Sequence, residues 1–498
     1  MKMWTRISGW NLVFLAIALS PCWSQVENGQ SQPVDEESQV SVALESSDVL
    51  AQPQTQEDSR APLADDSSVE APSPTRSFFV GSAYVNESAE SNATPDQTGG
   101  AQFYSVTRAT GSANLVKFWR RAMTAIDYTG GGIFYQSYAQ PIQELSLAQR
   151  FLWRRGQLTL RDNLGDLPGG SFGAPAFGGA GLYNLIFANS GAIPVAAGTP
   201  TFFGSSGFGG TGIGSNLTNV ALVEASQELT GRSTLTIGGA YGLTAYFGDT
   251  KNLIDNREIA ALADYSYQLS SRSQIGVFYG YRDFQFPHRG LGSGDVINNI
   301  AQLVFVHRLS GRMTFLAGAG PEFTTLRNRF ELLDGIIKLT ATSKQINVSA
   351  RGSLVYRLPR TTLALSYDRL VTSGSGFFAG ANSDIVQFSM SRHIWRSWNT
   401  SLDAGYVQLS SIGSSALGAP GKSFAYGYIG ANIDKKFGRH FGASASYQFN
   451  DQNFADPLCV AAKQCTTQRN VFLIGVHWNT RPIPLEHGFG RDGETDNN

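Results

Sequence analysis

From about residue 77 onward, apolar and polar side chains alternate along stretches of ten or more residues. In Ser233–Phe247 the larger apolar residues occupy odd positions, and Thr, Gly and Ala fill most of the even ones. Lys344–Tyr356 and His440–Asn450 show the same alternation. A period of two predicts β-strands, and these runs exceed the usual ~5–6 residues of globular strands. Because a tilted strand needs about 9–11 residues to cross a bilayer, the pattern favours membrane-spanning strands.

Two kinds of connection separate the predicted strands. One kind is short, begins with Trp, Leu or Phe and contains Arg: Trp119–Arg121, Trp153–Gly156, Leu229–Arg232, Leu269–Arg272, Leu309–Arg312, Leu358–Arg360, Trp395–Ser397 and Phe437–Arg439. The other kind is longer and polar: Gly248–Asn256, Gln285–Val296, Arg327–Ala341, Thr372–Ser383, Ser410–Gly421 and Asp451–Gln468. Short turns at one end and long loops at the other are typical of outer-membrane β-barrels. We expect the aromatic rings to lie at the membrane interface and the Arg side chains to contact headgroup phosphates there.

Eight short turns flank sixteen strands, and two further strands complete the count. Phe78–Val85 is the predicted first strand and is followed by Gln102–Trp119, while Asn470–Trp478 is the last. The sequence therefore predicts an all-β, transmembrane, antiparallel up-and-down β-barrel of about 18 strands. Sixteen strands is the alternative, if the first strand is absent or a loop interrupts the chain at Thr110-Gly111. An even number places both chain termini on the periplasmic side.

The closing strand alternates and ends on an aromatic residue, Trp478, with Phe472, Ile474 and Val476 on the same face. Such a strand resembles the signal that the outer-membrane assembly machinery recognises. We expect this machinery as a partner, together with outer-membrane lipid and lipopolysaccharide. The departure from the usual pattern is the further segment 479–498, for which we expect an unstructured periplasmic tail.

The N-terminus has the pattern of a cleavable export signal. Lys2 and Arg6 precede the apolar run Leu12–Leu19, and small residues near Ser24 allow cleavage there, so we assign residues 1–24 to a signal peptide. An uncleaved anchor and lipid attachment at Cys22 are the alternatives. Residues 25–76 contain eleven acidic residues and two Arg and few apolar ones, which predicts a disordered acidic linker in the periplasm.

Composition narrows the remaining classes of function. The chain has 38 basic and 39 acidic side chains, a balance that argues against nucleic-acid binding. After signal cleavage only Cys459 and Cys465 are left, and close spacing in an oxidising compartment predicts one disulfide between them. No cluster of His and Cys residues supplies four metal ligands, and we expect neither a metal nor another cofactor.

Alternation also predicts which charged side chains face the lumen. The candidates are Arg150, Arg161, Glu224, Asp264, Arg282, Arg351, Asp368 and Asp403. They could shape a transverse field that selects solutes, or they could pair across strands and fill the lumen. Both interpretations are open at this point.

The third long connection, residues 165–217, is the least ordinary segment. No charged residue occurs between Asp166 and Glu224, and the run is rich in Gly, Ala and Phe. The third loop of general porins folds inward and narrows the channel, and the position of this loop suggests the same. A surface loop that contacts lipid A or another protein is the alternative.

Sequence motifs of enzymes are missing. The chain has no His-Glu-x-x-His pair and no phosphate-binding loop. The six His residues are dispersed, and we expect no enzymatic activity. One exception stays open, a hydrolase with a Ser–His pair on the outer wall, which needs the two side chains within hydrogen-bond reach.

From Ser77 to Trp478 the chain resembles the putative β-barrel porin family of bacterial outer-membrane proteins. The resemblance is carried by repeated strand–turn–strand units, such as those around Leu309–Arg312 and Leu358–Arg360, and by the stretch Asp127–Gly132. It implies a place in the outer membrane of a Gram-negative-type envelope and a role in transport, and it transfers no catalytic residue. We expect a passive channel for small solutes. The alternative is a non-conducting structural barrel or an export partner of a surface polysaccharide system. The sequence does not predict the oligomeric state.

Overall fold

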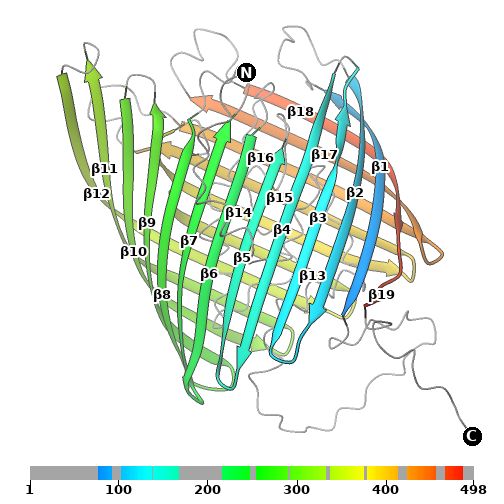
Figure 1. The fold of residues 1–498 in the computed structure, drawn as a ribbon, viewed down its shortest axis with the longest axis horizontal. Helices are drawn as coiled ribbons and strands as arrows, with labels where there is room; N and C mark the ends of the chain where they lie inside the picture. Colours follow the sequence, from blue (N-terminus) through cyan, green and yellow to red (C-terminus); the bar gives the residue numbers. More distant parts are fainter. Residues whose placement is uncertain are drawn as a thin grey trace, which may run out of the picture.

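The chain forms a closed β-barrel in a computed structural model, which describes residues 77–91, 103–136, 138–167, 216–246, 254–289, 292–332, 337–374, 378–412, 423–455 and 466–485 (Figure 1). Consecutive strands pair antiparallel from β1 to β18, and β1 pairs with β18 to close the wall. The all-β, 18-strand, up-and-down architecture is therefore confirmed. Within these ranges no helix is long and apolar enough to cross a membrane.

The strands are long, and most exceed twelve residues. Their bounds are β1 Phe78–Ser91, β2 Phe103–Phe118, β3 Ala122–Phe134, β4 Ala139–Trp153, β5 Gly156–Leu167, β6 Asn216–Thr230, β7 Ser233–Tyr246, β8 Asn256–Gln268, β9 Ser273–Arg289, β10 Gly292–Ser310, β11 Met313–Leu332, β12 Ile337–Leu358, β13 Thr361–Thr372, β14 Ala381–Trp395, β15 Trp398–Ser411, β16 Ser423–Phe437, β17 Phe441–Ala455, β18 Thr466–Asn479 and β19 Ile483–Pro484.

All eight short turns connect strands where the sequence places them, at one end of the barrel, which we call the turn end. Figure 1 shows them along the lower and right-hand rim. The opposite, loop end carries the longer connections. The asymmetry predicted from the sequence is confirmed in its main feature, although several of the loop-end connections are shorter than predicted.

Side chains alternate between an apolar outer face and a mixed inner face. On β7, Ile237 and Tyr241 are exposed, whereas Thr236, Ala240 and Thr244 are buried. On the closing strand the predicted outer residues Phe472, Ile474, Val476 and Trp478 are all exposed. Because the wall is closed, the buried face lines the interior, and the exposed apolar face is the one a bilayer would contact.

Three predicted details are wrong. Gln285–Val296 and Arg327–Ala341 are mostly strand and not loop, since β9 reaches Arg289, β10 starts at Gly292, and β11 and β12 pair up to Leu332 and Ile337. Backbone pairing needs no apolar side chains, so the ladder continues through polar sequence. β1 also extends past the predicted end at Val85 to Ser91. The sixteen-strand alternative is excluded, because β1 is present and β2 pairs through Thr110-Gly111 with both β1 and β3.

The segment after Trp478 also differs from the expected unstructured tail. β18 continues to Asn479, and Ile483–Pro484 then pairs with Phe79 and Phe78 of β1. Thr480 strengthens this contact, because its hydroxyl accepts the backbone N–H of Gly81 at 2.8 Å. The first residues of the tail therefore reinforce the start of β1.

The wall is offset between β12 and β13. These strands pair only from Ala350–Arg369 down to Leu358–Thr361, at the turn end. Above this point, Ile337–Ser349 of β12 pairs with β11 alone among the described strands, while β13 continues to pair with β14. The Asn347 side chain of β12 donates a hydrogen bond to Asn382 Oδ1 of β14 at 3.1 Å. Because Asn347 belongs to the inward-facing positions of β12, the β13–β14 hairpin passes along the inner side of β12.

Candidate functional site

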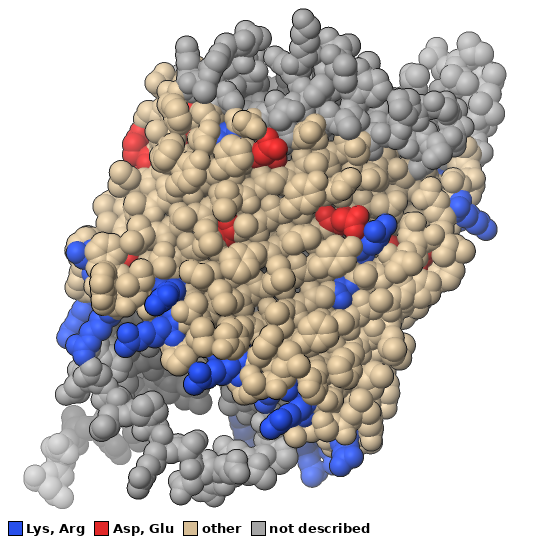
Figure 2. All heavy atoms as spheres, turned by 180° about the vertical axis from the view of Figure 1, so that it is seen from behind, with Lys and Arg blue, Asp and Glu red and all other residues tan. Residues whose placement is uncertain are grey.

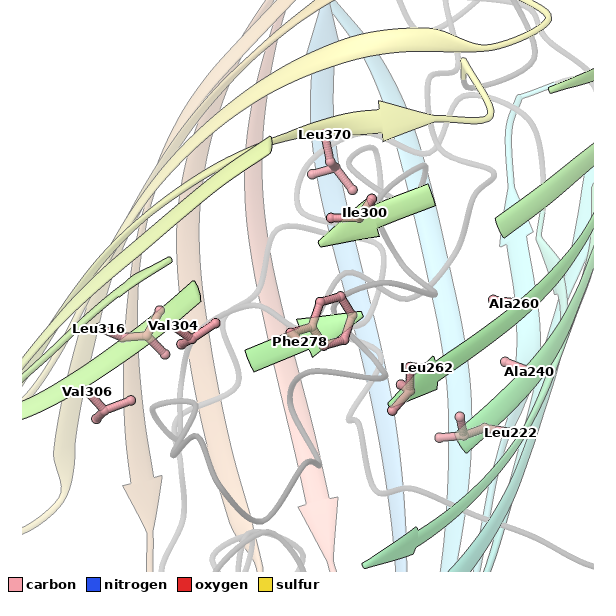
Figure 3. Packing of buried hydrophobic residues seen from close by; sticks show 10 residues of the cluster. All are labelled: Leu222, Ala240, Ala260, Leu262, Phe278, Ile300, Val304, Val306, Leu316 and Leu370. Carbon is pink, nitrogen blue, oxygen red and sulfur yellow. The ribbon is translucent and has the colours of Figure 1, made fainter. Parts of the chain in front are cut away.

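The inner face of β6 to β11 contains a cluster of apolar side chains between polar ones. Figure 3 shows Leu222, Leu262, Phe278 and Ile300 on neighbouring strands of this wall, with Leu370 of β13 next to Ile300. All of these residues are buried. A strand from a different part of the wall therefore contributes to the inner surface here.

The end of the β13–β14 hairpin lies inside the barrel. We call Leu370–Gly374 and Phe378–Ala381 the tip. In a strand of the wall every second residue faces outward, but seven successive described side chains of the tip are buried, none more than 7% exposed: Leu370, Val371, Thr372, Ser373, Phe378, Ala379 and Ala381. Thr372–Ser383 was predicted as an external loop, but its described residues fold inward, and the chain is strand again from Ala381 onward.

The two backbone polar groups of Val371 are bound by side chains of β9 and β11. The Val371 N–H donates to Glu322 Oε1 on β11 at 2.9 Å. Its carbonyl accepts from Arg282 Nη1 on β9 at 3.1 Å. Both partners are buried, so each bond replaces a strand hydrogen bond that Val371 would otherwise make with β12.

Arg282 and Glu322 are held in place by further contacts with neighbouring strands. Arg282 forms an ion pair of 2.6 Å with Glu258 on β8 and stacks over Phe284 at 4.6 Å. Glu322 Oε1 also accepts the amide of Asn298 on β10 at 2.6 Å. A buried polar network that spans β8 to β11 therefore holds the tip.

Apolar contacts surround the polar ones. Val371 and Ala379 pack with Phe284, Phe286 and Val296 of the β9–β10 wall. Phe378 packs on the other side, in a cluster with residues of β14 to β16 that include Tyr426 and Tyr428. The tip thus fills space between two inner walls.

Two glycines allow the chain to turn within the tip. Gly374 and Gly380 have φ of 80° and 85°, in the left-handed region that other residues adopt at a cost. A Cβ at Gly380 would lie 2.9 Å from Val296 Cγ2, so the backbone also approaches β10 closely. Gly380 N donates to Ser373 O, and Ile412 N at the end of β15 donates to Gly380 O, both at 3.2 Å.

The predicted lumen-facing charges lie in several places along the inner wall. Arg150 and Glu224 both pair in register with Thr159 of β5, and Arg161 is two residues further along that strand. These three side chains are buried, as is Asp264 on β8. Strand register therefore brings Arg150, Arg161 and Glu224 into one patch.

The other candidates are elsewhere. Arg351 on β12 and Asp368 on β13 are register partners with a 3.7 Å separation between Nε and Oδ1. Arg282 belongs to the network at the tip. Asp403 on β15 is half-buried, one strand from Tyr428. Arg351 and Asp368 therefore follow the second of the two interpretations given for the lumen-facing charges, pairing across strands.

Seven buried charged residues escaped the sequence analysis, among them Asp162 of β5 and Asp434 of β16. Glu258 and Glu322 belong to the network at the tip. Both occupy inward-facing positions in the alternation of their strands, so the alternation would have identified them. Glu90 of β1 lies between Arg108 of β2 and Arg469 of β18, and we call these three the seam triad. Arg108 Nη2 is 2.6 Å from Glu90 Oε1, and Arg469 pairs with Glu90 Oε2. The triad crosses the point at which the first and last strands meet.

A Ser–His pair on the outer wall meets the geometric requirement set above. Ser273 Oγ is 2.9 Å from His307 Nδ1, and the two residues are register partners on β9 and β10 near the turn end. His307 stacks on Phe305. Among the described residues no carboxylate or amide hydrogen-bonds the other ring nitrogen of His307. The pair lacks the orienting group that an acyl-transfer site needs.

Several predicted features lie outside the described residues. These are the signal peptide (1–24), the linker (25–76), Cys459, Cys465 and residues 168–215 of the third long connection. That connection was assigned to 165–217, whereas β5 runs to Leu167 and β6 begins at Asn216. In the described ranges no three His, Cys, Asp or Glu side chains are grouped to hold a metal ion.

No protein-family model matches the sequence, and neither does any curated protein. Solved structures of similar fold include the ferric-catecholate import receptor Fiu from E. coli K12 in its open form (TM-score 0.40, 7% identity, 80% of this chain and 81% of that chain). The siderophore receptor PiuA from Acinetobacter baumannii is similar, with a TM-score of 0.40, 8% identity, and coverage of 81% of this chain and 82% of that chain. Pseudomonas aeruginosa OpdK with vanillate is also similar, with a TM-score of 0.37, 9% identity, and coverage of 81% of this chain and 98% of that chain. The barrel architecture expected from the sequence is confirmed by the strand pairing of the structure itself. Similarity this distant carries no argument about function.

Proposed function

We propose that the chain is an outer-membrane barrel that works as a passive channel for small solutes, with the tip as an internal constriction. The observation that carries the proposal is the position of the tip, folded inside a closed wall and bound there through both backbone polar groups of Val371. A barrel of 18 strands is wide enough to leave space inside, since 16–18-stranded porins contain an aqueous channel. A fixed inward segment narrows that space without closing the wall.

The inner surface favours solutes without a strong net charge. Around the tip, apolar side chains of β9 to β11 and of β14 to β16 dominate. The buried charged side chains that bind the tip are Arg282 and Glu322, and Arg282 is also paired with Glu258. A solute that passes here would meet mainly apolar groups and backbone.

Planar-bilayer conductance and vesicle swelling test this proposal. The purified protein should give stable single channels, and neutral sugars or amino acids should enter vesicles at rates that fall with solute size. Absence of both conductance and swelling would refute a channel.

The rival is a non-conducting barrel, with a structural role or as a partner in surface polysaccharide export. The apolar clusters on both sides of the tip favour it, because they bury side chains that an open channel would leave in water. The same two measurements separate the proposals.

Location and partners follow as further proposals. The turn end would face the periplasm, together with the linker and the C-terminal segment, and the loop end would face lipopolysaccharide. We propose no enzymatic role, since the Ser273–His307 pair has no orienting group among the described residues.

A further inference from the structure

The turn end of the barrel carries a ring of exposed arginines. The eight short turns contain ten Arg and no Asp or Glu. All ten are exposed: Arg120, Arg121, Arg154, Arg155, Arg232, Arg272, Arg312, Arg360, Arg396 and Arg439. We call them the turn arginines. Figure 2 shows Lys and Arg in a band along the lower rim, below a surface with few charges.

These guanidinium groups have little to bind in the barrel itself. Apart from Arg396, none of the turn arginines forms an ion pair with a carboxylate of the described residues. Arg predominates over Lys in the turns, and its planar fork binds carboxylates and phosphates through two parallel hydrogen bonds. The ring therefore fits an anionic partner that can contact several arginines at once.

The same chain supplies such a partner. Residues 25–76 carry eleven acidic residues against Arg60 and Arg76, and contain no Lys. They join the barrel at the turn end, because Ser77 lies beside the first turn: its hydroxyl accepts the N–H of Phe118 at 3.0 Å, next to Trp119. The acidic segment thus starts at the ring.

Length permits the contact. A flexible chain of about fifty residues has a root-mean-square end-to-end distance of about 40 Å. An 18-strand barrel is about 35 Å across, because strands lie about 4.8 Å apart and tilt by about 40°. The segment can therefore reach turns on the far side of the ring. Tethering gives it an effective concentration of about a millimolar.

We propose that the acidic segment, residues 27–70, binds the turn arginines of its own barrel. A single exposed ion pair contributes little, but many pairs formed by one tethered chain add together. Such binding would offset the positive charge of the turn end. This inference does not depend on whether the barrel conducts.

Photo-crosslinking in the full-length mature chain tests it. Benzoylphenylalanine in place of Ser271, at an exposed turn beside Arg272, should crosslink within the same molecule to peptides of 25–76, identified by mass spectrometry. The matched control places the same amino acid at Leu303, on the exposed apolar face, where no crosslink to the segment is expected. Raising NaCl from about 0.1 M to about 1 M shortens the Debye length from about 10 Å to about 3 Å and should lower the yield about tenfold.

Two variants of the segment leave the barrel unchanged. Replacing its eleven acidic residues by Asn and Gln should lower the yield about as much as salt does. Scrambling its sequence while keeping its charge should preserve the yield, since the interaction is electrostatic. A neutralised segment that crosslinks as well as the native one would overturn the proposal.

Lipid headgroup phosphates could occupy the turn arginines instead of the acidic segment. Vesicles of different lipid composition distinguish the two occupants. Crosslinking should persist in phosphatidylcholine vesicles and in vesicles with added phosphatidylglycerol. If phosphatidylglycerol abolishes it, headgroups occupy the ring and the proposal is wrong. As a second variant, R154K/R155K keeps the charge and should retain crosslinking, whereas R154Q/R155Q should reduce it.

Discussion

Glu322 on β11 accepts the backbone N–H of Val371 on β13 at 2.9 Å, although β12 separates the two strands in the wall. The bond exists because β13 leaves β12 above Arg369 and carries Val371 along the inner face of the barrel. A carboxylate thus takes the place of the strand partner that Val371 has lost.

Removing this carboxylate should release the tip. E322A leaves the N–H of Val371 and the amide of Asn298 without their acceptor, at a cost of about 1–3 kcal/mol per group. We expect a lower urea midpoint of unfolding in lipid vesicles and larger or noisier single-channel currents. E322Q keeps an acceptor oxygen and should lie close to the native protein. Equal midpoints and currents for E322A and the native chain would contradict the assigned role.

Gly380 should tolerate no side chain. G380A combines an unfavourable φ with a 2.9 Å approach to Val296 Cγ2, so the tip would have to move away from β10. The control is G438A: Gly438 has φ of 70° but no atom within 4 Å of a Cβ. G438A should lose only about 1 kcal/mol from backbone strain, whereas G380A should lose more and alter conductance. Equal losses of stability in G380A and G438A would mean that the close approach of Gly380 to β10 does not contribute to the effect.

The seam triad should be needed for closure. E90A leaves Arg108 and Arg469 buried without their shared carboxylate, which we expect to cost about 3–5 kcal/mol. D384N breaks the exposed Arg369–Asp384 pair, at 3.4 Å, and should cost about 0–1 kcal/mol. Urea unfolding followed by gel mobility without heating measures both. A loss for E90A no larger than that for D384N would show that the triad does not stabilise the seam.

The exposed apolar face should contact lipid. Leu303 on β10 is 57% exposed, so L303R should cost about 2–4 kcal/mol in a bilayer if it lies near the midplane. S271R, at a turn, should cost about 0–1 kcal/mol, because the new charge reaches the interface. Unfolding in vesicles gives both values, and equal costs would argue against a membrane around β10.

Ser273 should have no catalytic role. Because His307 lacks an orienting partner in the described part of the chain, the native protein and S273A should hydrolyse p-nitrophenyl esters at the same background rate. Turnover by the native protein that S273A abolishes would establish a hydrolase instead.

Local pattern predicted the wall well. β7 ends one residue from the predicted limit, Phe247, because its outer Ile237 and Tyr241 alternate with small inner residues. The pattern failed where strands extend through polar sequence, as at Asp295, which pairs with Gln285 and Arg327. Alternation reports which surface a side chain meets, whereas backbone pairing continues as long as a neighbouring strand is present.

The tip could not have been predicted in this way. Leu370 and Val371 are as apolar as any strand end, and their partners Arg282 and Glu322 are 89 and 49 residues distant from Val371. The departure of β13 from β12 is a tertiary relationship with no local sequence pattern. The disulfide between Cys459 and Cys465 stays a prediction.

Closure through β1 and β18 has a consequence for synthesis. Arg469 and Glu90 are 379 residues apart, so the last ladder cannot form until nearly the whole chain is available. Contacts of such separation are slow to form, and until then the first strand has an unpaired edge. A chain truncated before Thr466 would not give a smaller barrel. It would give an open sheet with two free edges, prone to aggregate, and nascent chains would need protection up to the last strand.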